Sequence, residues 1–447
     1  MRSPVRPRPA TAVALAFALA VVAGCTQVVP GRASAALSFP TGGDSLGSAT
    51  LAAVEDIWRE EFPRAFGEQW RDITTVVPVF TDDPAAGEPP CVRSVAEVSG
   101  QAFYCPSADA VAWDADGLLP QLNDRFGQAG VAVVLAHEVG HAVQSRLGLD
   151  EAQARNPAQY PTILLEAMAD CYAGMVVARL SERSIPGLPM GQVERDDAIL
   201  ALVGFRDPLG VAPTDQSAHG NAFDRVSAFQ DGFTEGTEKC AAMTLQNREF
   251  TQRRFGSADD LARGGDLPLT ELLDAVELDA QEWFGTLLPG FVPPPLSGSA
   301  EGPVACAPDD LAAQGPARYC ADDGTVSIDR RELAVLHDRF GDYAAATLVV
   351  SRYAMATLDA AGTPTVGPDA GAAALCLSGS YTGRLIDPDG GFALSPGDLD
   401  EAVTVMLTGD WPARDSAGDP APGDFGFERV DQFRTGLLEG PTGCLTP

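Results

Sequence analysis

The sequence predicts an α+β protein built as two tandem domains, and three observations support the tandem arrangement. The chain has 447 residues, more than the roughly 100–200 residues of one ordinary domain. Apart from Cys25, its eight cysteines form two sets of four, and corresponding members are offset by 215, 215, 205 and 204 residues. The tetrapeptide Asp-Arg-Phe-Gly at 124–127 recurs at 338–341. We therefore expect one domain over residues 44–250 and a related one over residues 266–447.

The N-terminus resembles a bacterial lipoprotein signal. Three arginines precede an apolar run at residues 10–22, which is shorter than the roughly 20 residues that a transmembrane helix needs. Small residues then lead directly to Cys25. We expect residues 1–24 to be removed, Cys25 to be lipidated, and residues 25–43 to form a flexible tether. The alternative is an ordinary secretory signal with an incidental cysteine, but lipidation predicts a protein anchored to the extracytoplasmic face of the cell membrane.

The composition excludes one class of partner. The chain carries 62 acidic and 30 basic residues, a formal net charge of −32, so it lacks the basic surface that binds phosphate backbones. We therefore expect no nucleic acid partner. A hydrophobic fraction of 45% with 21% charged residues is typical of soluble globular domains.

The two sets of cysteines predict disulfides, because an even number in an exported protein is typical of oxidised pairs. Four cysteines in each half allow three connectivities. The favoured one joins the first to the second and the third to the fourth: Cys91 with Cys105, Cys171 with Cys240, Cys306 with Cys320, and Cys376 with Cys444. A cysteine-held zinc site is the alternative, but the chain has no CxxC pair to support it.

A buried helix is predicted over residues 131–147, where no proline interrupts a helical spacing of apolar residues. This segment contains the motif His-Glu-Val-Gly-His at 137–141. Residues four apart share one helix face, so His137 and His141 can hold the same ion. Glu138 can reach a water on that ion without being a ligand. The motif therefore predicts one Zn²⁺ per chain, with Glu138 as general base.

A second helix is predicted over residues 162–180, and it carries Glu166 and Asp170 on one face. A catalytic zinc site has three protein ligands and leaves one position for water. We expect Glu166 to be the third ligand and Asp170 to orient a zinc-bound histidine. The reversed assignment, with Asp170 on the metal, remains open at this point.

Four motifs together resemble the bacterial neutral zinc metallopeptidase family of membrane-associated peptidases. They are the segments 135–144 and 166–174 on the two helices, Phe-Tyr-Cys-Pro at 103–106, and Ser-Ala-His-Gly at 217–220. The resemblance covers roughly residues 44 to 245, and it departs from the family at Ala142, where many members have another histidine. The family implies a zincin-like fold with a small sheet above the motif helix and a glutamate as third ligand. A strand near residues 110–113 would then line the cleft and pair with an extended peptide.

The expected reaction is hydrolysis of a peptide or protein substrate by zinc-activated water, with Glu138 moving the proton. The tetrahedral intermediate also needs a hydrogen-bond donor beside the metal. His219 is the favoured catalytic donor because it is the only histidine of this half outside the motif. Tyr160 and Tyr172 are the alternatives.

The second half is predicted to be a zincin-like domain that has lost its metal ligands. In register, the positions of His137, Glu138, His141, Glu166 and Asp170 are taken by Ser351, Arg352, Met355, Gly371 and Leu375, and that of His219 falls near Gly423. His337 has no neighbouring ligands and is expected to be structural. A binding or scaffolding lipoprotein that keeps zinc for stability is the rival to a peptidase, but a structural site needs no base such as Glu138.

Overall fold

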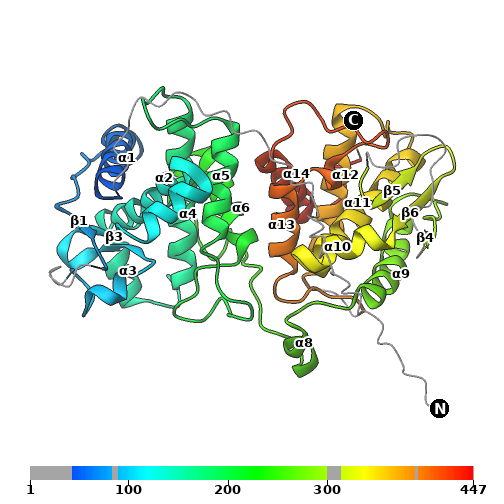
Figure 1. Ribbon diagram of the computed structural model, residues 1–447, viewed down its shortest axis with the longest axis horizontal. Helices are drawn as coiled ribbons and strands as arrows, with labels where there is room; N and C mark the ends of the chain where they lie inside the picture. Colours follow the sequence, from blue (N-terminus) through cyan, green and yellow to red (C-terminus); the bar gives the residue numbers. More distant parts are fainter. Residues whose placement is uncertain (1–42, 83–88, 300–313, 388–390, 446–447) are drawn as a thin grey trace, which may run out of the picture. The chain divides into compact units, whose positions relative to one another are not determined.

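Helices make up most of the structure, and two small β-sheets accompany them (Figure 1). The computed structural model describes residues 43–82, 89–299, 314–387 and 391–445. These residues belong to one compact unit. The α+β class predicted from the sequence is therefore confirmed. The expected signal peptide, Cys25 and most of the tether lie outside the described residues.

The first half consists of one small sheet and a set of packed helices. Its elements, in order, are α1 (Gly43–Phe66), β1 (Thr75–Val79), η1 (Val95–Val98), β2 (Ala102–Cys105), η2 (Pro106–Ala108), β3 (Ala110–Asp114), α2 (Leu118–Arg146), α3 (Leu149–Arg155), α4 (Thr162–Ser181), α5 (Gln192–Val203), α6 (Ala222–Glu235) and α7 (Thr237–Ala241). Helix α2 packs against α1, α4 and α5, and α4 packs against α6. The first core therefore centres on α2 and α4.

The central strand of the first sheet is β3. It runs parallel to β1 on one side and antiparallel to β2 on the other. All five of its residues are buried, which suits its sequence of alanine, valine and tryptophan. Strand β2 thus forms one edge of this sheet and packs beside α2.

The motif helix is the second part of α2. Gly127 adopts a non-helical conformation with φ of 61°, so it separates a first part from the part that was predicted over residues 131–147. Nearly every residue from Ala129 to Gln144 is buried. Gly140 allows α4 to come close at the level of the motif, because an added Cβ would lie 2.9 Å from the Cα of Ala169.

The helix predicted over residues 162–180 is α4, which ends one residue later at Ser181. Its partner α6 approaches very closely, since a Cβ on Gly232 would lie 1.7 Å from the carbonyl oxygen of Cys171. The disulfide between Cys171 and Cys240 also joins α4 to α7. Helix α4 is therefore fixed from two sides.

The predicted disulfide pairing is confirmed for three of the four pairs. Cys91 is bonded to Cys105, with 5.8 Å between their Cα atoms, while Cys171–Cys240 and Cys376–Cys444 have Cα distances of 5.5 Å. The fourth predicted pair includes Cys306, which lies outside the described residues.

The second half follows the same order of elements. They are α8 (Ala258–Arg263), α9 (Leu269–Leu287), β4 (Leu296–Ser299), β5 (Ala317–Cys320), β6 (Thr325–Asp329), α10 (Arg330–Phe340), α11 (Asp342–Ala360), α12 (Pro368–Arg384), α13 (Asp398–Thr408), η3 (Trp411–Ala413) and α14 (Gly426–Glu439). The sheet order β4-β6-β5 repeats the pattern of β1-β3-β2, with one parallel and one antiparallel pair. A Cβ added to Gly436 would lie 1.7 Å from the carbonyl oxygen of Cys376, just as one added to Gly232 would lie 1.7 Å from that of Cys171. These features fit the predicted tandem repeat.

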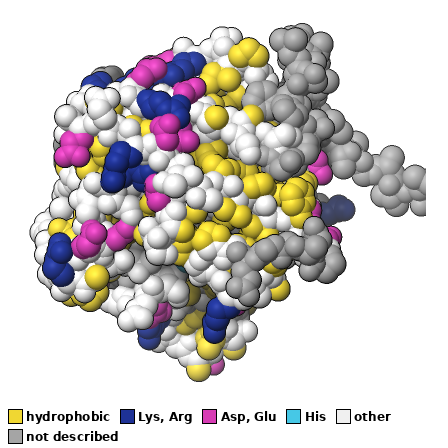
Figure 2. Space-filling view, turned by 90° about the vertical axis from the view of Figure 1, so that its left-hand side faces the viewer, with side chains coloured by type: hydrophobic (Ala, Val, Ile, Leu, Met, Phe, Trp, Pro, Cys, Tyr) yellow, Lys and Arg dark blue, Asp and Glu magenta, His cyan; other side chains and the backbone are white. Residues whose placement is uncertain are grey.

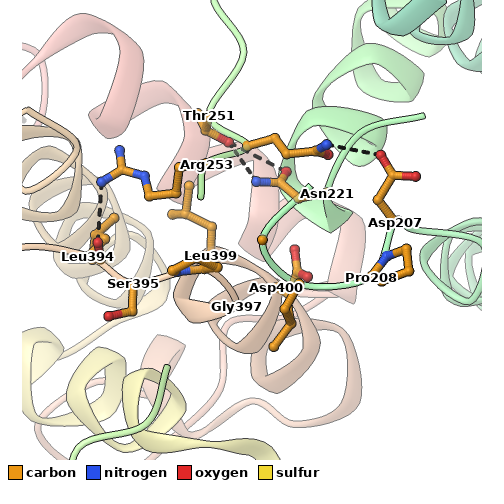
Figure 3. Close-up of a pocket in the computed structure, with 14 residues that line it drawn as sticks. Asp207, Pro208, Asn221, Thr251, Arg253, Leu394, Ser395, Gly397, Leu399 and Asp400 are labelled. Atoms are coloured by element: carbon orange, nitrogen blue, oxygen red, sulfur yellow. Dashed lines mark hydrogen bonds between the residues drawn. The ribbon is translucent and has the colours of Figure 1, made fainter. Parts of the chain in front are cut away.

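Helices of the two halves pack against each other, α13 against α6 and α14 against α5 and α6. Asp400 of α13 accepts hydrogen bonds from Arg206 Nε at 2.8 Å and from the backbone N–H of Ala222 at 2.7 Å. Arg195 of α5 pairs with Glu428 of α14 at 2.6 Å. A cavity of about 20 Å³ lies beside Asp400 and the segment at 207–210 (Figure 3). The second half thus touches the segment between α5 and α6.

None of the helices in the described residues combines the length and apolar character that crossing a membrane requires. Val76 on the edge strand β1 and Phe80, which directly follows this strand, are 40% and 41% exposed. Figure 2 shows hydrophobic side chains gathered on the face at this side of the molecule, with charged side chains around them.

Candidate metal centre

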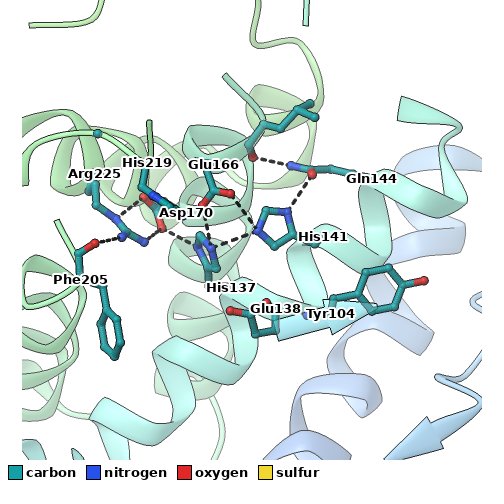
Figure 4. A network of polar contacts seen from close by, with 12 residues as sticks. Tyr104, His137, Glu138, His141, Gln144, Glu166, Asp170, Phe205, His219 and Arg225 are labelled. Carbon is teal, nitrogen blue, oxygen red and sulfur yellow. Dashed lines mark hydrogen bonds and ion pairs between the residues drawn. The ribbon is translucent and has the colours of Figure 1, made fainter. Parts of the chain in front are cut away.

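Two histidines from α2 and a carboxylate from α4 converge inside the first half (Figure 4). The Nε2 atoms of His137 and His141 are 3.2 Å apart. Glu166 places Oε2 at 3.2 Å from the first nitrogen and Oε1 at 3.5 Å from the second. All three ligand atoms lie within 4.8 Å of one another, so one ion can contact all of them.

The chemistry of this donor set fits a zinc ion. Oε2 of Glu166 is buried and has no hydrogen-bond partner among the described residues, although it lies 3.2 Å from His137 Nε2. A buried carboxylate oxygen without a partner is costly, and a cation would satisfy it. Two imidazole nitrogens and one carboxylate are a ligand set that zinc enzymes use, with a fourth position left for water.

Asp170 lies behind His137 rather than at the convergence point. Its Oδ1 is 2.6 Å from Nδ1 of His137, on the side of the ring opposite the ligand nitrogen. Arg225 of α6 donates to the same carboxylate from Nε at 2.9 Å and from Nη2 at 2.8 Å. Burial opposes the charge of Asp170, but Arg225 and His137 outweigh it and lower the pKa of this carboxyl. The geometry therefore favours Glu166 over Asp170 as the third ligand.

Glu138 points to the sheet side of the same site. Its Oε2 accepts a hydrogen bond of 2.9 Å from the backbone N–H of Tyr104 on the edge strand β2. Burial raises the pKa of Glu138 above that of an ordinary glutamate, which suits a group that must accept a proton near neutral pH. The edge strand β2 is therefore in direct contact with Glu138, the proposed base.

His219 lies on the segment between α5 and α6 and reaches the same cavity. Its ring Nδ1 is 3.2 Å from Oδ1 of Asp207, and Oδ2 of Asp207 accepts from the backbone N–H of His219 at 2.7 Å. The hydrogen bond to Asp207 raises the pKa of His219 despite partial burial. The side chain is 47% exposed, so it can present a proton to a ligand in the cavity.

A cavity of about 770 Å³ opens over the converging side chains. One side of the cavity is lined by residues 101–104, which belong to β2 and the residue before it. Another side is lined by residues 205–208. The strand expected to line the cleft, residues 110–113, is instead the buried central strand β3, because β2 occupies the edge next to α2. The volume suits a peptide segment rather than a solvent molecule.

The two alternative donors lie elsewhere. Tyr172 is fully buried against Trp58, with ring centroids 5.4 Å apart, so its hydroxyl cannot reach the cavity. Tyr160 lies in the turn that precedes α4 and packs on the hydrophobic core, outside the residues that line the cavity. His219 is therefore the candidate that the structure brings to the cavity.

Some residues of the network were not singled out from the sequence for any role. Gln144 contacts His141 Nδ1 through Oε1 at 3.0 Å and also donates to the carbonyl of Leu165. It follows His141 by three residues, so helical spacing alone could have indicated it. Asp207 and Tyr104 carry no such local signal, because each reaches the site from a distant part of the chain.

The corresponding place in the second half is filled by protein. Arg352 is fully buried and donates hydrogen bonds to the carbonyl oxygens of Ala317 and Arg414, at 3.1 and 2.8 Å, and also to those of Gln314 and Trp411. A Cβ on Gly371 would lie 1.7 Å from the carbonyl oxygen of Ala413, so η3 sits directly on α12. His337 donates a hydrogen bond of 2.8 Å from Nε2 to the carbonyl oxygen of Leu267, and among the described residues it belongs to no cluster of metal-ligating side chains.

The first half is similar in sequence to a described protein family. Residues 22–243 match the model of the family described as "Putative neutral zinc metallopeptidase". This match supports a zinc metallopeptidase at the level of the family.

Two relatives are similar to part of the chain. "Uncharacterized protein YpfJ" of Escherichia coli (strain K12) is 27% identical over 206 residues, which is 42% of this chain and 67% of that protein. "Uncharacterized protein Rv2575" of Mycobacterium tuberculosis is 28% identical over 205 residues, or 42% of this chain and 66% of that protein. The chain thus spans about two thirds of each relative. No solved structure gives a significant match.

Proposed function

We propose that the protein is a zinc metallopeptidase that hydrolyses peptide bonds in the cavity of its first half. The observation that carries this proposal is the convergence of His137, His141 and Glu166, beside which lies Glu138, whose carboxylate is not one of the three ligands. A zinc site that only stabilises a fold commonly has four protein ligands and needs no base. This donor set has three, and it opens into a cavity of about 770 Å³.

His137, His141 and Glu166 would hold the ion, and Asp170 would fix the ring of His137 through Nδ1. When bound, zinc supplies Lewis acidity toward a carbonyl oxygen and makes a water molecule more acidic. Glu138 takes the proton of the attacking water and later delivers it to the leaving amine. Arg225 holds Asp170 in place from the far side.

The edge strand β2 supplies a binding surface for the substrate backbone. An extended peptide can add to an exposed strand by backbone hydrogen bonds. Because the N–H of Tyr104 contacts Glu138, a peptide on this strand lies next to the base. His219 faces the cavity and, as a cation held by Asp207, can stabilise negative charge on the scissile carbonyl oxygen.

The second half would act as a support without metal ligands. Arg352 fills the position of the base and binds backbone carbonyls instead. Asp400 holds the segment that carries His219 through Arg206 and the N–H of Ala222. This arrangement favours one active site for the two halves.

We place the protein at the extracytoplasmic face of the membrane, anchored through lipidated Cys25. The apolar run and the small residues before this cysteine support the proposal. A Cys25→Ser variant should leave the membrane fraction of fractionated cells, and a variant that stays there would refute the anchor.

The peptidase proposal is tested with denatured proteins and a peptide library. Zinc-loaded wild type should cleave them, while Glu138→Gln should retain about one zinc per chain and lose at least about a hundredfold in rate, as expected for removal of a general base. A Glu182→Gln variant, altered at an exposed acid at the end of α4, is the matched control. Equal cleavage by Glu138→Gln and wild type would refute the proposal, and no cleavage by either would favour a scaffolding role.

A further inference from the structure

A second group of acidic side chains lies in the second half, away from the proposed zinc site. Asp266 precedes α9, Asp342 begins α11, and Glu401 belongs to the first turns of α13. One carboxylate oxygen from each lies within 4.8 Å of the other two. Three separate chain segments therefore direct negative charge at one point.

The backbone is shaped to bring these carboxylates together. Gly341 has φ of 107°, and an added Cβ would overlap the carboxyl group of Glu401 at 2.0 Å. Only a residue without a side chain lets Glu401 lie against this turn. Its Oε2 accepts from the N–H of Tyr343 at 2.7 Å, and Asp342 Oδ2 accepts from the N–H of Leu267 at 2.6 Å. Oδ1 of Asp342 is left without a hydrogen bond among the described residues, while the carboxyl group of Glu401 also meets that of Asp266.

A buried oxygen in this group has no partner. Asp342 is 3% exposed, and its Oδ1 makes no hydrogen bond among the described residues. The neighbouring Asp398, 4% exposed, also has an unpartnered Oδ1. A buried carboxylate oxygen without a hydrogen-bond donor is unfavourable, and a bound cation would satisfy it.

Apart from His337, whose charge favours the ionised form of Asp342, the described surroundings supply little compensating charge. Within the described residues, no arginine or lysine forms an ion pair with Asp266, Asp342 or Glu401. His337, the nearest basic side chain on α10, is directed to the carbonyl of Leu267 at 2.8 Å. Burial and the charges of Asp342 and Asp266 raise the pKa of Glu401 to about 9, as happens when carboxylates crowd together without a cation.

We propose that Asp266, Asp342 and Glu401 form a binding site for one hard divalent cation, with Ca²⁺ as the preferred ion. Carboxylate oxygens without nitrogen or sulfur donors select hard cations rather than zinc. Ca²⁺ tolerates irregular ligand geometry and completes its shell with carbonyl oxygens and water, whereas Mg²⁺ requires near-ideal octahedral geometry. Ligands on three different segments favour the more tolerant ion.

The cation would join the start of the second half to α11 and α13. Asp266 lies in the segment that enters this half, so the ion would fix that segment on the helices. Helix α13 packs on α6, and Asp400, the residue before Glu401, accepts a hydrogen bond from the N–H of Ala222. Ca²⁺ would thus stabilise the half that supports the α5–α6 segment.

Isothermal titration of the zinc-loaded, full-length protein with CaCl₂ at pH 7.5 tests the proposal, together with thermal unfolding. Wild type should bind one Ca²⁺ per chain and melt at a higher temperature with Ca²⁺. Asp342→Asn and Glu401→Gln should each weaken Ca²⁺ binding at least tenfold. Asp322→Asn, at an exposed turn of the same half, should bind Ca²⁺ like wild type.

Two further measurements separate this site from the zinc site. A His141→Ala variant should lose zinc but keep its Ca²⁺ binding, whereas loss of both would show that Ca²⁺ occupies the zinc centre and would overturn the proposal. If Asp342→Asn folds poorly, Glu401→Gln decides, since Glu401 is partly exposed. Absence of Ca²⁺ binding by wild type, unchanged binding by both acidic variants, or tighter binding of Mg²⁺ would each contradict the assignment.

Discussion

Asp170 and Glu166 lie one helical turn apart on α4, but they have different neighbours and therefore different proposed roles. The carboxylate of Asp170 is completely buried and already binds His137 Nδ1 and the guanidinium of Arg225. Glu166 lies at the wall of the cavity and has an oxygen without a hydrogen-bond partner. Loss of a residue that orients a metal ligand weakens the affinity for the metal, whereas loss of a ligand removes one of the bonds that hold the metal.

This difference predicts unequal losses of zinc affinity. Glu166→Gln should abolish stoichiometric zinc binding at micromolar metal, while Asp170→Asn should weaken it by about 10–100-fold. Competition with a chromophoric zinc chelator measures both. Glu182→Gln serves as the control for charge on α4, since Glu182 is an exposed acid. If Asp170→Asn loses zinc and Glu166→Gln retains it, the two roles are reversed.

The pair His219 and Asp207 predicts a pH effect. The hydrogen bond from His219 to Asp207 raises the pKa of the imidazole, so the cation that donates to the substrate persists to higher pH. Asp207→Asn removes that carboxylate, and the pKa of His219 should fall toward about 6.5. The high-pH limb of kcat/KM should therefore move to lower pH, with zinc content unchanged.

A pH–rate profile of the zinc-loaded enzyme measures this shift. The control variant is Asp215→Asn, which changes an exposed acid on the same segment. Its pH–rate profile should be the same as that of wild type. If the high-pH limb is identical in Asp207→Asn and wild type, His219 does not act as the cationic donor.

At the scale of elements, glycines set the distances that build the site. Gly140 brings α2 within reach of α4, and Gly232 brings α6 onto α4 beside the disulfide of Cys171. These contacts are between backbone atoms, which cannot rotate away as side chains can. Close helix packing thus places Glu166 of α4 and Arg225 of α6 around the histidines of α2.

Gly232→Ala should therefore disturb both stability and the site. The added Cβ would meet the carbonyl oxygen of Cys171 at 1.7 Å, so α6 must move and the free energy of unfolding should fall by about 1–3 kcal/mol. Chemical denaturation measures this loss, and zinc affinity should fall with it. Gly256→Ala is the matched control, since its Cβ would meet no atom within 4 Å. Equal stability of both variants would contradict the packing account.

Local patterns predicted the helices, the disulfides and the ligand spacing, because each depends on residues close in sequence or on the cysteine repeat. Helical periodicity and the open position of a zinc site pointed to residues 137–141 and to the pair Glu166 and Asp170, but the choice between these two carboxylates needed the structure. Three features required the folded chain. Asp207 and Tyr104 reach the site through tertiary packing, and the edge position belongs to β2 rather than to residues 110–113 because strand order is a long-range property.

At the scale of the whole molecule, we propose that the second half has no metal site of the first half's kind and supports the first half, on which it packs. Arg352 stands where the base was expected and binds backbone carbonyls. On the other side of this half, Asp400 accepts from Arg206 and from the N–H of Ala222, which bracket the segment that carries His219. The contact that Asp400 makes between the halves therefore helps to position His219, the proposed catalytic donor.

Asp400→Asn should weaken this link. We expect kcat/KM to fall by about tenfold with zinc affinity unchanged, since residues that couple sites in this way contribute about 0.5–2 kcal/mol. Steady-state kinetics on a cleaved peptide measures the effect. Glu428→Gln, which removes the Arg195 pair elsewhere between the halves, should leave kcat/KM near that of wild type. A matching loss in Glu428→Gln would mean that the halves matter only for overall stability.

The central claim is that the chain builds one zinc site, in its first half, from two motif histidines and one glutamate. Anomalous diffraction at the zinc absorption edge from crystals of the zinc-loaded protein tests it directly. One strong peak is expected between His137 Nε2, His141 Nε2 and the carboxylate of Glu166, with Asp170 outside coordination distance. A peak coordinated by Asp170 instead, a second zinc peak beside Arg352, or no peak at the motif would contradict the account.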